Sequence, residues 1–199
     1  LPPEVTPLTI GVTGYGNVAR GAWEIIDLLP VRRIEPAQLP EVTGFSGGAH
    51  PIYATTFREE HMVEPREDQD GFDCQRYYDC PEAYRGIFER HLPHLSVIVN
   101  GIYWDERYPR LVTKQALSEA HATGNLRLEV IGDISCDVQG SIECTVKATE
   151  PGEPVYVYHP PTGSAADGID GEGVVVADVD PARIAQVRLQ LPALAHRRL

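Results

Sequence analysis

The sequence predicts an α/β fold built on a doubly wound parallel sheet. Three observations favour it: short apolar runs rich in β-branched residues, segments of helical spacing between them, and a glycine-rich turn directly after the first run. Hydrophobic residues make up 42% and charged residues 23% of the 199 positions, as in ordinary globular proteins. The chain shows no internal repeat and no low-complexity tract.

The predicted strands are short apolar segments bounded by turn residues. The first covers residues 8–13 and reads LTIGVT, which is typical of a strand buried on both faces of a parallel sheet. Others are expected over 31–34, 52–57, 95–100, 126–131, 155–158 and 174–179. Ligands of open α/β sheets bind where such strands reach their carboxyl ends.

Helical spacing predicts a helix over 18–29, which Pro30 ends. Further helices are expected over 81–91, with a proline in the first turn, over 113–122, with Thr113 as the cap, and over 181–191. Residues 35–51 are rich in Pro and Gly and are expected to form a loop with one short helix at most. The charged stretch 59–79 lacks periodicity and is expected to be an irregular surface excursion.

Charge and cysteine usage exclude several classes of function. A formal net charge of −12 argues against nucleic-acid binding, which needs clustered Lys and Arg, and against anionic membrane surfaces. No apolar run approaches the roughly 18–20 residues that span a bilayer, and the N-terminus lacks a signal-like core. The four cysteines, at positions 74, 80, 136 and 144, lack CxxC spacing. We expect reduced thiols in a cytoplasmic protein, with a Cys74–Cys80 disulfide as the open alternative.

The glycine-rich turn lies where the first strand hands over to the first helix. Gly14 permits a tight turn, Gly16 lets the backbone approach a pyrophosphate, and Gly21 would let the helix pack closely on the sheet. Asn17 and Val18 begin the helix, whose free N–H groups favour phosphate. The spacing GxGxxxxG is longer than the common GxGxxG. The turn therefore predicts a Rossmann-like dinucleotide-binding unit.

An acidic residue stands where an adenosine ribose would bind. Glu35 follows Gly16 by 19 residues, just after the predicted second strand. Its carboxylate would accept hydrogen bonds from the ribose and repel a 2′-phosphate, which favours NAD. Arg32 and Arg33 lie close by and would instead serve NADP. A solvated loop carboxylate is the third interpretation of Glu35, so the sequence leaves NAD or NADP open.

Two later segments carry a family resemblance. They are NGIYW (residues 100–104), followed by PRLVT (109–113), and GDISCD (132–137), followed by GSIE (140–143). Together with GYGNVARGA (14–22) and VRRIEP (31–36), they resemble the NAD(P)-binding domain of lysine–2-oxoglutarate reductase and saccharopine dehydrogenase, members of the alanine dehydrogenase and transhydrogenase superfamily. The resemblance runs from about residue 8 to about residue 176.

The resemblance implies an NAD(P)-dependent oxidoreductase of lysine metabolism. In that family the ε-amine of lysine and the keto group of 2-oxoglutarate form an imine, which a nicotinamide hydride reduces reversibly to saccharopine. By resemblance, the pyrophosphate is held by Gly14, Gly16, Asn17 and Val18. The cleft beside the cofactor ribose is lined by Asn100, Gly101, Ile102 and Tyr103. Asp133 and Ile134 border the nicotinamide, with Asp137 on the substrate side.

Structural roles are the alternatives at several of these positions. Asp133 could be a turn carboxylate, Asp137 a helix cap, and Tyr103 and Trp104 packing residues. His91 and His94 have the spacing HxxH but no third ligand, so no metal site is predicted.

The resemblance also implies a missing part. Family members have a separate catalytic domain, partly N-terminal to the glycine loop, which supplies the acid–base Lys and His. Only seven residues precede Leu8, so we expect a separate domain or subunit to supply those groups, and we assign no catalytic residue in this chain. The expected division is a dinucleotide-binding domain over 1–178 and a divergent tail over 179–199, which resembles the terminal strand and helix of nitrilase-type hydrolases.

Other functions stay open at this point. One is a non-catalytic dinucleotide-binding module or truncated remnant, and another is a superfamily member acting on a different amino acid such as alanine. Lysine, 2-oxoglutarate and saccharopine are the expected small-molecule partners, and homo-oligomerisation is undecided.

Overall fold

The computed structural model describes residues 1, 5–44, 51–67, 71–150, 153–167 and 174–178. Its strands are β1 (Leu8–Thr13), β2 (Arg32–Arg33), β3 (Ile52–Phe57), β4 (Val63–Pro65), β5 (Tyr84–Gly86), β6 (Val97–Asn100), β7 (Val130–Asp133), β8 (Val155–His159), β9 (Ser164–Asp167) and β10 (Val174–Asp178). Its helices are α1 (Asn17–Ile26), α2 (Leu39–Gly44), α3 (Glu59–Met62), α4 (Cys74–Asp79) and α5 (Lys114–Ala122), with 3₁₀ turns η2 (Pro36–Gln38), η3 (Pro81–Ala83) and η4 (Phe88–His94).

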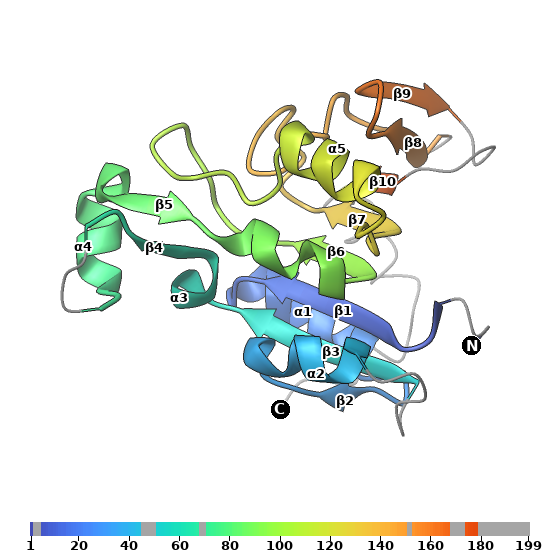
Figure 1. The fold of residues 1–199 in the computed structure, drawn as a ribbon, viewed down its shortest axis with the longest axis horizontal. Helices are drawn as coiled ribbons and strands as arrows, with labels where there is room; N and C mark the ends of the chain where they lie inside the picture. Colours follow the sequence, from blue (N-terminus) through green and yellow to red (C-terminus); the bar gives the residue numbers. More distant parts are fainter. Residues whose placement is uncertain (2–4, 45–50, 68–70, 151–152, 168–173, 179–199) are drawn as a thin grey trace.

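Eight of the ten described strands form one large sheet with the order β2-β3-β1-β6-β7-β10-β8-β9 (Figure 1), and β4 and β5 form a separate two-stranded sheet. The run from β2 to β10 is parallel, whereas β8 and β9 add on in antiparallel fashion. This confirms the predicted doubly wound, Rossmann-like class. One detail departs from the common strand order: β3 lies next to β1, and β2, which precedes it in sequence, lies outside β3.

Helices cover the two faces of the sheet because the strands are buried on both sides. α1 packs on one face, where Ala19 and Ile26 meet Ile10, Val12 and Ala54. On the other face, α2, η4 and α5 bury residues against the sheet (Figure 1), namely Leu39, Phe88, Leu92 and Leu117. Alternate residues of β6 face the two cores, so this strand contributes to both.

The first helix is shorter than predicted and uses a different small residue against the sheet. It ends at Ile26 rather than at position 29, and a turn leads to Pro30. Ala19 is buried at 1% exposure. Gly21, two residues on, is turned by about 200° around the helix axis and lies on the opposite side. The predicted packing role of Gly21 is therefore wrong, and Ala19 has that role.

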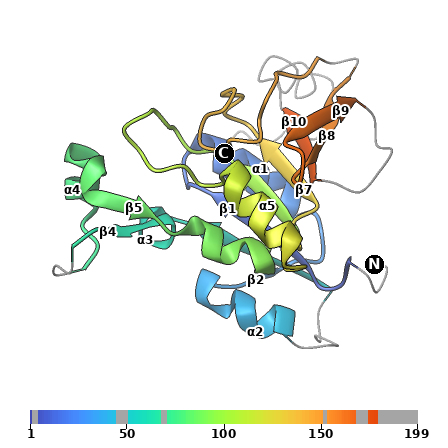
Figure 2. The same ribbon diagram turned by 45° about the horizontal axis from the view of Figure 1, so that its top comes forward.

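The segment between β3 and β6 is more regular than predicted. Residues 59–79 contain α3, β4 and α4 rather than an irregular excursion, and the helix predicted over 81–91 is replaced by η3, β5 and η4. The reason is tertiary: β5 pairs with β4 in an antiparallel hairpin, and Tyr84 is buried at 1% exposure. Figure 2 shows this hairpin and α4 projecting from the body of the sheet.

The boundaries of other elements differ from the predicted ones by a few residues. β7 begins at Val130 instead of 126, because its register starts where Val130 meets Val97 of β6. Leu126 and Leu128 still pack in the core, but from a non-strand segment. Thr113 caps α5 as predicted, since its Oγ1 accepts a hydrogen bond from the Ala116 amide at 3.1 Å. β9 was not predicted.

Four further expectations concern the C-terminal helix, the tail, the cysteines and membrane-spanning helices. The helix predicted over 181–191 and the tail over 179–199 lie outside the described residues. All four cysteines are free thiols, so the open Cys74–Cys80 disulfide is not formed. Within the described ranges, no helix combines the length and the apolar character needed to cross a bilayer.

Candidate functional site

Apart from Glu35, the residues predicted to bind the cofactor gather at the carboxyl ends of β1, β6 and β7. The chain leaves β1 toward β3 and β2 on one side and continues through β6 and β7 on the other, so the winding direction changes between β1 and β6. Ligands of open α/β sheets bind in the crevice at such a switch point.

The glycine loop begins with a turn that only glycine adopts without strain. Gly14 has φ +84°, and a Cβ there would lie 3.1 Å from Cγ2 of Ile102. Its N–H donates to the carbonyl oxygen of Phe57 at 2.9 Å, which ties the loop to the end of β3. Gly14 therefore serves the turn itself and brings the loop against the segment that follows β6.

Gly16 is different, because nothing in the chain needs its missing side chain. A Cβ at Gly16 would meet no atom within 4 Å. Gly16 is the N-cap residue of α1, whose end has no side-chain cap and no acidic residue in its first turn. Asn17 and Val18 are exposed beside it. The open space lies over unpaired helix N–H groups, which fits the approach of a pyrophosphate.

A buried hydrogen-bond network joins the ends of the three strands. Thr13 Oγ1 donates to Asn100 Oδ1 at 2.7 Å and accepts from the Gly101 amide at 3.3 Å. Asn100 Nδ2 donates to Asp133 Oδ1 at 2.8 Å and to Ser141 Oγ at 2.9 Å. All these side chains are buried, and Thr13, Asn100 and Asp133 are at 0% exposure.

Asp133 is the acceptor at the centre of this network. Its Oδ1 also accepts from Ser135 Oγ at 2.8 Å and from the Ser135 amide at 3.3 Å, and its Oδ2 accepts from Thr145 Oγ1 at 2.6 Å. Such a set of donors compensates a carboxylate that has left water. The side chains of Asn100 and Asp133 thus brace the loops on which other predicted residues stand.

The segment after β6 lies against the glycine loop and the first turn of α1. A Cβ on Gly101 would lie 2.8 Å from Cγ1 of Val18, so the segment touches the first turn of α1. Ile102 contacts Gly14 and is half-buried. Tyr103 is 80% exposed, and only a 3.3 Å hydrogen bond to Asp105 holds its hydroxyl. The packing alternative for Tyr103 is therefore wrong.

The turn after β7 places two further predicted residues. Ile134 is half-buried, and its amide donates to the Asn100 carbonyl oxygen at 2.9 Å. Asp137 is exposed and accepts the Gly140 amide at 2.8 Å through its backbone. A Cβ on Gly140 would come within 2.5 Å of the Asp137 Cβ, so this tight turn needs glycine.

Glu35 lies one strand further from the glycine loop than its sequence spacing suggested. It follows β2, which is separated from β1 by β3. Its backbone carbonyl oxygen accepts from the Gln38 amide at 2.9 Å, and its own amide donates to Gln38 Oε1 at 2.9 Å, so it caps η2. Arg33 is also engaged, in a 2.6 Å ion pair with Asp27. The strand that borders β1 ends instead at Phe57, followed by Arg58.

A cluster that the sequence reasoning missed lies at this end of β3. Tyr15 of the glycine loop and Tyr78 of α4 both donate from their hydroxyls to Oε1 of Glu59, Tyr15 at 3.3 Å. The Glu59 carboxylate raises the pKa of Tyr15, and burial together with Glu59 raises the pKa of Tyr78. The contact links α4 to the glycine loop, and no local sequence pattern signals it because 44 and 19 residues separate the partners.

The two histidines of the HxxH spacing, His91 and His94, contact neighbouring side chains. The ring of His91 lies 4.9 Å from that of Phe57, and burial lowers the pKa of His91 to about 4. His94 hydrogen-bonds through Nδ1 to Thr43 at 2.8 Å. Across the described ranges, no group of three His, Cys, Asp or Glu residues is arranged to hold a metal ion.

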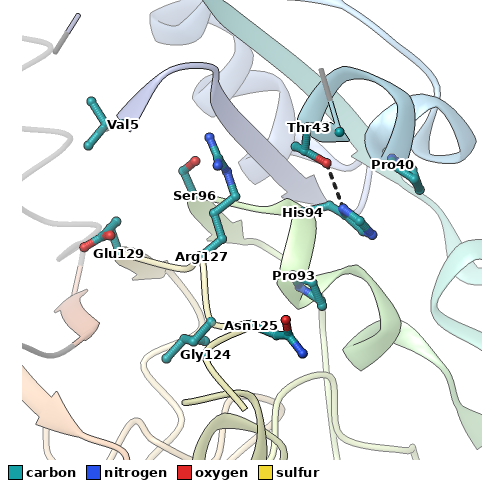
Figure 3. A pocket seen from close by; sticks show the side chains of 12 residues that line it. Val5, Pro40, Thr43, Pro93, His94, Ser96, Gly124, Asn125, Arg127 and Glu129 are labelled. Atoms are coloured by element: carbon teal, nitrogen blue, oxygen red, sulfur yellow. Dashed lines mark hydrogen bonds between the residues drawn. The ribbon is translucent and has the colours of Figure 1, made fainter. Parts of the chain in front are cut away.

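A second hollow lies at the opposite edge of the sheet (Figure 3). It has a volume of about 520 Å³ and is lined by segments that precede β1, β6 and β7, including His94 and Arg127. The Arg127 guanidinium donates to the Pro7 carbonyl oxygen. None of the predicted site residues lines this hollow, so the glycine-loop edge is the better candidate.

Comparisons with known proteins show which sequences the chain is similar to. No protein-family model matches the chain. The chain is 37% identical over 191 residues to the alpha-aminoadipic semialdehyde synthase of Arabidopsis thaliana. It is 32% identical to the mitochondrial alpha-aminoadipic semialdehyde synthase of Bos taurus and 31% to that of Mus musculus, each over 195 residues. The alignments cover 90% of this chain but only 18–21% of the relatives, so the chain spans about a fifth of their length.

Proposed function

Because the chain is homologous over 90% of its length to a segment of alpha-aminoadipic semialdehyde synthases, we propose that it is the NAD(P)-binding domain of an oxidoreductase that forms or cleaves saccharopine. The confirmed resemblance is to lysine–2-oxoglutarate reductase and saccharopine dehydrogenase. Substrates of this reaction would be lysine and 2-oxoglutarate in one direction and saccharopine in the other.

The observation that carries the proposal is the open space at Gly16 over the uncapped end of α1. Residues from Gly14 to Val18 would hold the pyrophosphate by backbone N–H groups. This local attraction offsets a net charge of −12, which would otherwise disfavour an anionic nucleotide.

The remaining predicted residues have two kinds of role in this proposal. Gly101, Ile102, Tyr103, Ile134 and Asp137 stand on the crevice side, where the ribose, the nicotinamide and the substrate would lie. Asn100 and Asp133 act as positioning residues, because their buried network sets the mutual distance of the three loops. Bound there, a nicotinamide would donate or accept the hydride, and the loops would orient it toward the substrate.

The groups that move protons to and from the substrate are not assigned to this chain. We propose that another domain or subunit supplies them. The alignments cover only about a fifth of the length of the relatives. A dinucleotide-binding module without catalysis is the second candidate. The division at residue 178 and the cytoplasmic location stay predictions.

Two measurements test the proposal in sequence. The first is titration of the chain with NADH and with NADPH, followed by nucleotide fluorescence. The second is oxidation of the reduced nucleotide with lysine plus 2-oxoglutarate, and the reverse reaction with saccharopine, with and without the polypeptide that supplies the other domain. Failure to bind either nucleotide would overturn the proposal. Binding with no turnover in the completed assembly would favour the non-catalytic module.

A further inference from the structure

The hollow at the opposite edge of the sheet from the glycine loop is lined by two unpaired charges of opposite sign. It lies where β1, β6 and β7 begin. Arg127 and Glu129 line it from the segment that leads into β7, on either side of the buried Leu128. Within the described ranges, no ion pair joins them or engages either one with another residue. Both charges are therefore open to a ligand.

A backbone contact holds Arg127 in place without neutralising it. Its Nη2 donates to the Pro7 carbonyl oxygen, and its Nε is buried without a hydrogen-bond partner. A guanidinium has five N–H donors, so its outer nitrogens keep donors that no acceptor in the described part of the chain uses. Arg127 thus presents a positioned charge with a planar set of donors, which matches the geometry of a carboxylate.

Three of the other polar side chains in the hollow are already hydrogen-bonded. Ser96 Oγ lies 3.2 Å from Thr9 Oγ1. Thr43 Oγ1 donates to the Leu39 carbonyl oxygen at 2.8 Å, and His94 Nδ1 lies 2.8 Å from the same hydroxyl (Figure 3). These residues form walls, and the two unpaired charges decide what kind of ligand binds.

The helix end at this edge does not neutralise Arg127 either. A helix C-terminus carries only about half an elementary charge, from carbonyl groups without partners. The last carbonyl groups of α5 have partners. Those of Glu119, Ala120 and His121 accept the amides of Thr123, Asn125 and Gly124 at 3.1, 2.9 and 3.0 Å, respectively.

The size and the walls of the hollow favour a small organic molecule. Apolar surface comes from Val5, Pro40, Pro93 and Leu126. A volume of about 520 Å³ is that of a small-molecule site rather than of an ion site. A phosphate dianion would bring a second negative charge close to Glu129, in a chain whose net charge is already −12. A molecule with one carboxylate, one ammonium group and an apolar side chain matches both charges and the walls.

We propose that this hollow binds a free α-amino acid with an apolar side chain, with its carboxylate on Arg127 and its ammonium group on Glu129. The ligand would contact the segments that enter β1, β6 and β7, whereas the glycine-loop site lies at the other ends of the same strands. It would therefore not compete with a nucleotide. The inference does not depend on the proposed function, because it uses none of the residues of the glycine-loop site.

Four probes test which charges the hollow recognises: L-valine, 3-methylbutanoate, 2-methylpropylamine and inorganic phosphate. The second is valine without its amino group, and the third is valine without its carboxylate. Binding to the unaltered chain is followed by calorimetry and by NMR titration. We expect L-valine to bind with a Kd on the order of 1 mM and each analogue with one charge to bind at least about tenfold more weakly. Phosphate should also bind more weakly than L-valine.

Two variants assign the two charges. Arg127→Gln should weaken L-valine at least about tenfold and leave 2-methylpropylamine unchanged. Glu129→Gln should weaken L-valine about 3- to 10-fold and leave 3-methylbutanoate unchanged. The matched controls are Arg32→Gln and Glu41→Gln, because both residues are exposed and neither lines the hollow. Both controls should bind L-valine as the unaltered chain does.

His94 reports whether the ligand binds in this hollow. Burial, and after it the charge of Arg127, lower the pKa of His94. A carboxylate on Arg127 offsets that charge, so L-valine should raise the pKa of His94. An NMR titration of the His94 ring, identified by the resonance that His94→Gln lacks, measures the shift. Binding of L-valine with no change at His94 would place the ligand elsewhere and overturn the inference.

The other outcomes also decide the matter. Failure of L-valine to bind overturns the inference and leaves the proposed function untouched. Tighter binding of phosphate or of 3-methylbutanoate than of L-valine overturns it too, because the hollow would then be a simple anion site. Glu129 is exposed and has no described partner, so Glu129→Gln is expected to fold even where Arg127→Gln lowers the melting temperature. Unchanged L-valine affinity in Glu129→Gln would by itself contradict the assignment.

Discussion

The side-chain amide of Asn100 donates a 2.8 Å hydrogen bond to the carboxylate of Asp133, and neither side chain is exposed to solvent. The two residues are register partners at the ends of β6 and β7. With Thr13 on the other side of Asn100, the pair locks the carboxyl ends of three adjacent strands together. Buried polar contacts therefore hold together the edge of the sheet at which most of the predicted site residues lie.

Removal of the Asp133 carboxylate should destabilise the whole domain. Asp133→Ala leaves buried donors of Asn100 and Thr145 without an acceptor, and we expect a loss of about 3–5 kcal/mol in the free energy of unfolding. Asp137→Ala, in the exposed turn four residues on, should change it by less than about 0.5 kcal/mol. Urea denaturation of both variants measures the difference. Equal effects would show that the network contributes little.

Two glycine substitutions in one loop should have different effects. Gly16→Ala meets no atom within 4 Å in the chain and should cost at most about 1 kcal/mol of stability while weakening nucleotide binding. Gly14→Ala forces a side chain into φ +84° and should cost about 1–3 kcal/mol. Thermal melting and nucleotide titration of both variants separate the two roles. Unchanged nucleotide affinity in Gly16→Ala would contradict the assignment of the open space.

The contact between Gly101 and Val18 should show energetic coupling. A Cβ on Gly101 would lie 2.8 Å from Val18 Cγ1, so Gly101→Ala should cost about 1–3 kcal/mol through overpacking. The added methyl group finds room when Val18 is shortened, so the same substitution should cost less in a Val18→Ala background. A double-mutant cycle on unfolding free energies measures this coupling. Additive effects would mean that the segment after β6 moves away from α1 freely.

His91 should make stability depend on pH in the acidic range. Burial lowers its pKa from 6.5 to about 4, so between these values the unfolded chain binds the proton more readily than the folded chain. The contribution of neutral His91 is present above about pH 6.5 and is lost as pH falls toward about 4.

The matched variant is His91→Phe, which keeps a ring against Phe57 and Phe88. Its unfolding free energy should fall less steeply over the same pH range. An identical slope in both proteins would show that other groups cause the acid sensitivity.

The local patterns were sufficient for much of the fold. The first and last residues of β1 and β3 were predicted correctly, and Thr113 was identified as the cap of α5. Burial on both faces of a strand and capping of a helix each produce a recognisable pattern within a few residues of sequence. Residues 59–79 and 81–91 were predicted wrongly, because β4 and β5 are short and Tyr84 is buried by contacts with residues from elsewhere in the chain. Strands whose pairing partners lie about 20 residues apart in the sequence leave no periodic hydrophobic pattern from which the pairing could be predicted.

The sequence by itself determined that a glycine turn at Gly14 follows a buried strand and precedes a helix, which limits the fold class and the kind of ligand. Only the tertiary structure decided which strand adjoins that turn. It places β3 beside β1 and moves Glu35 one strand outward, so that Arg58 stands opposite Gly14. The physical reason is that strand order comes from hydrogen-bond partners and helix packing across the whole sheet, whereas chain spacing records only how far apart two residues are along the backbone.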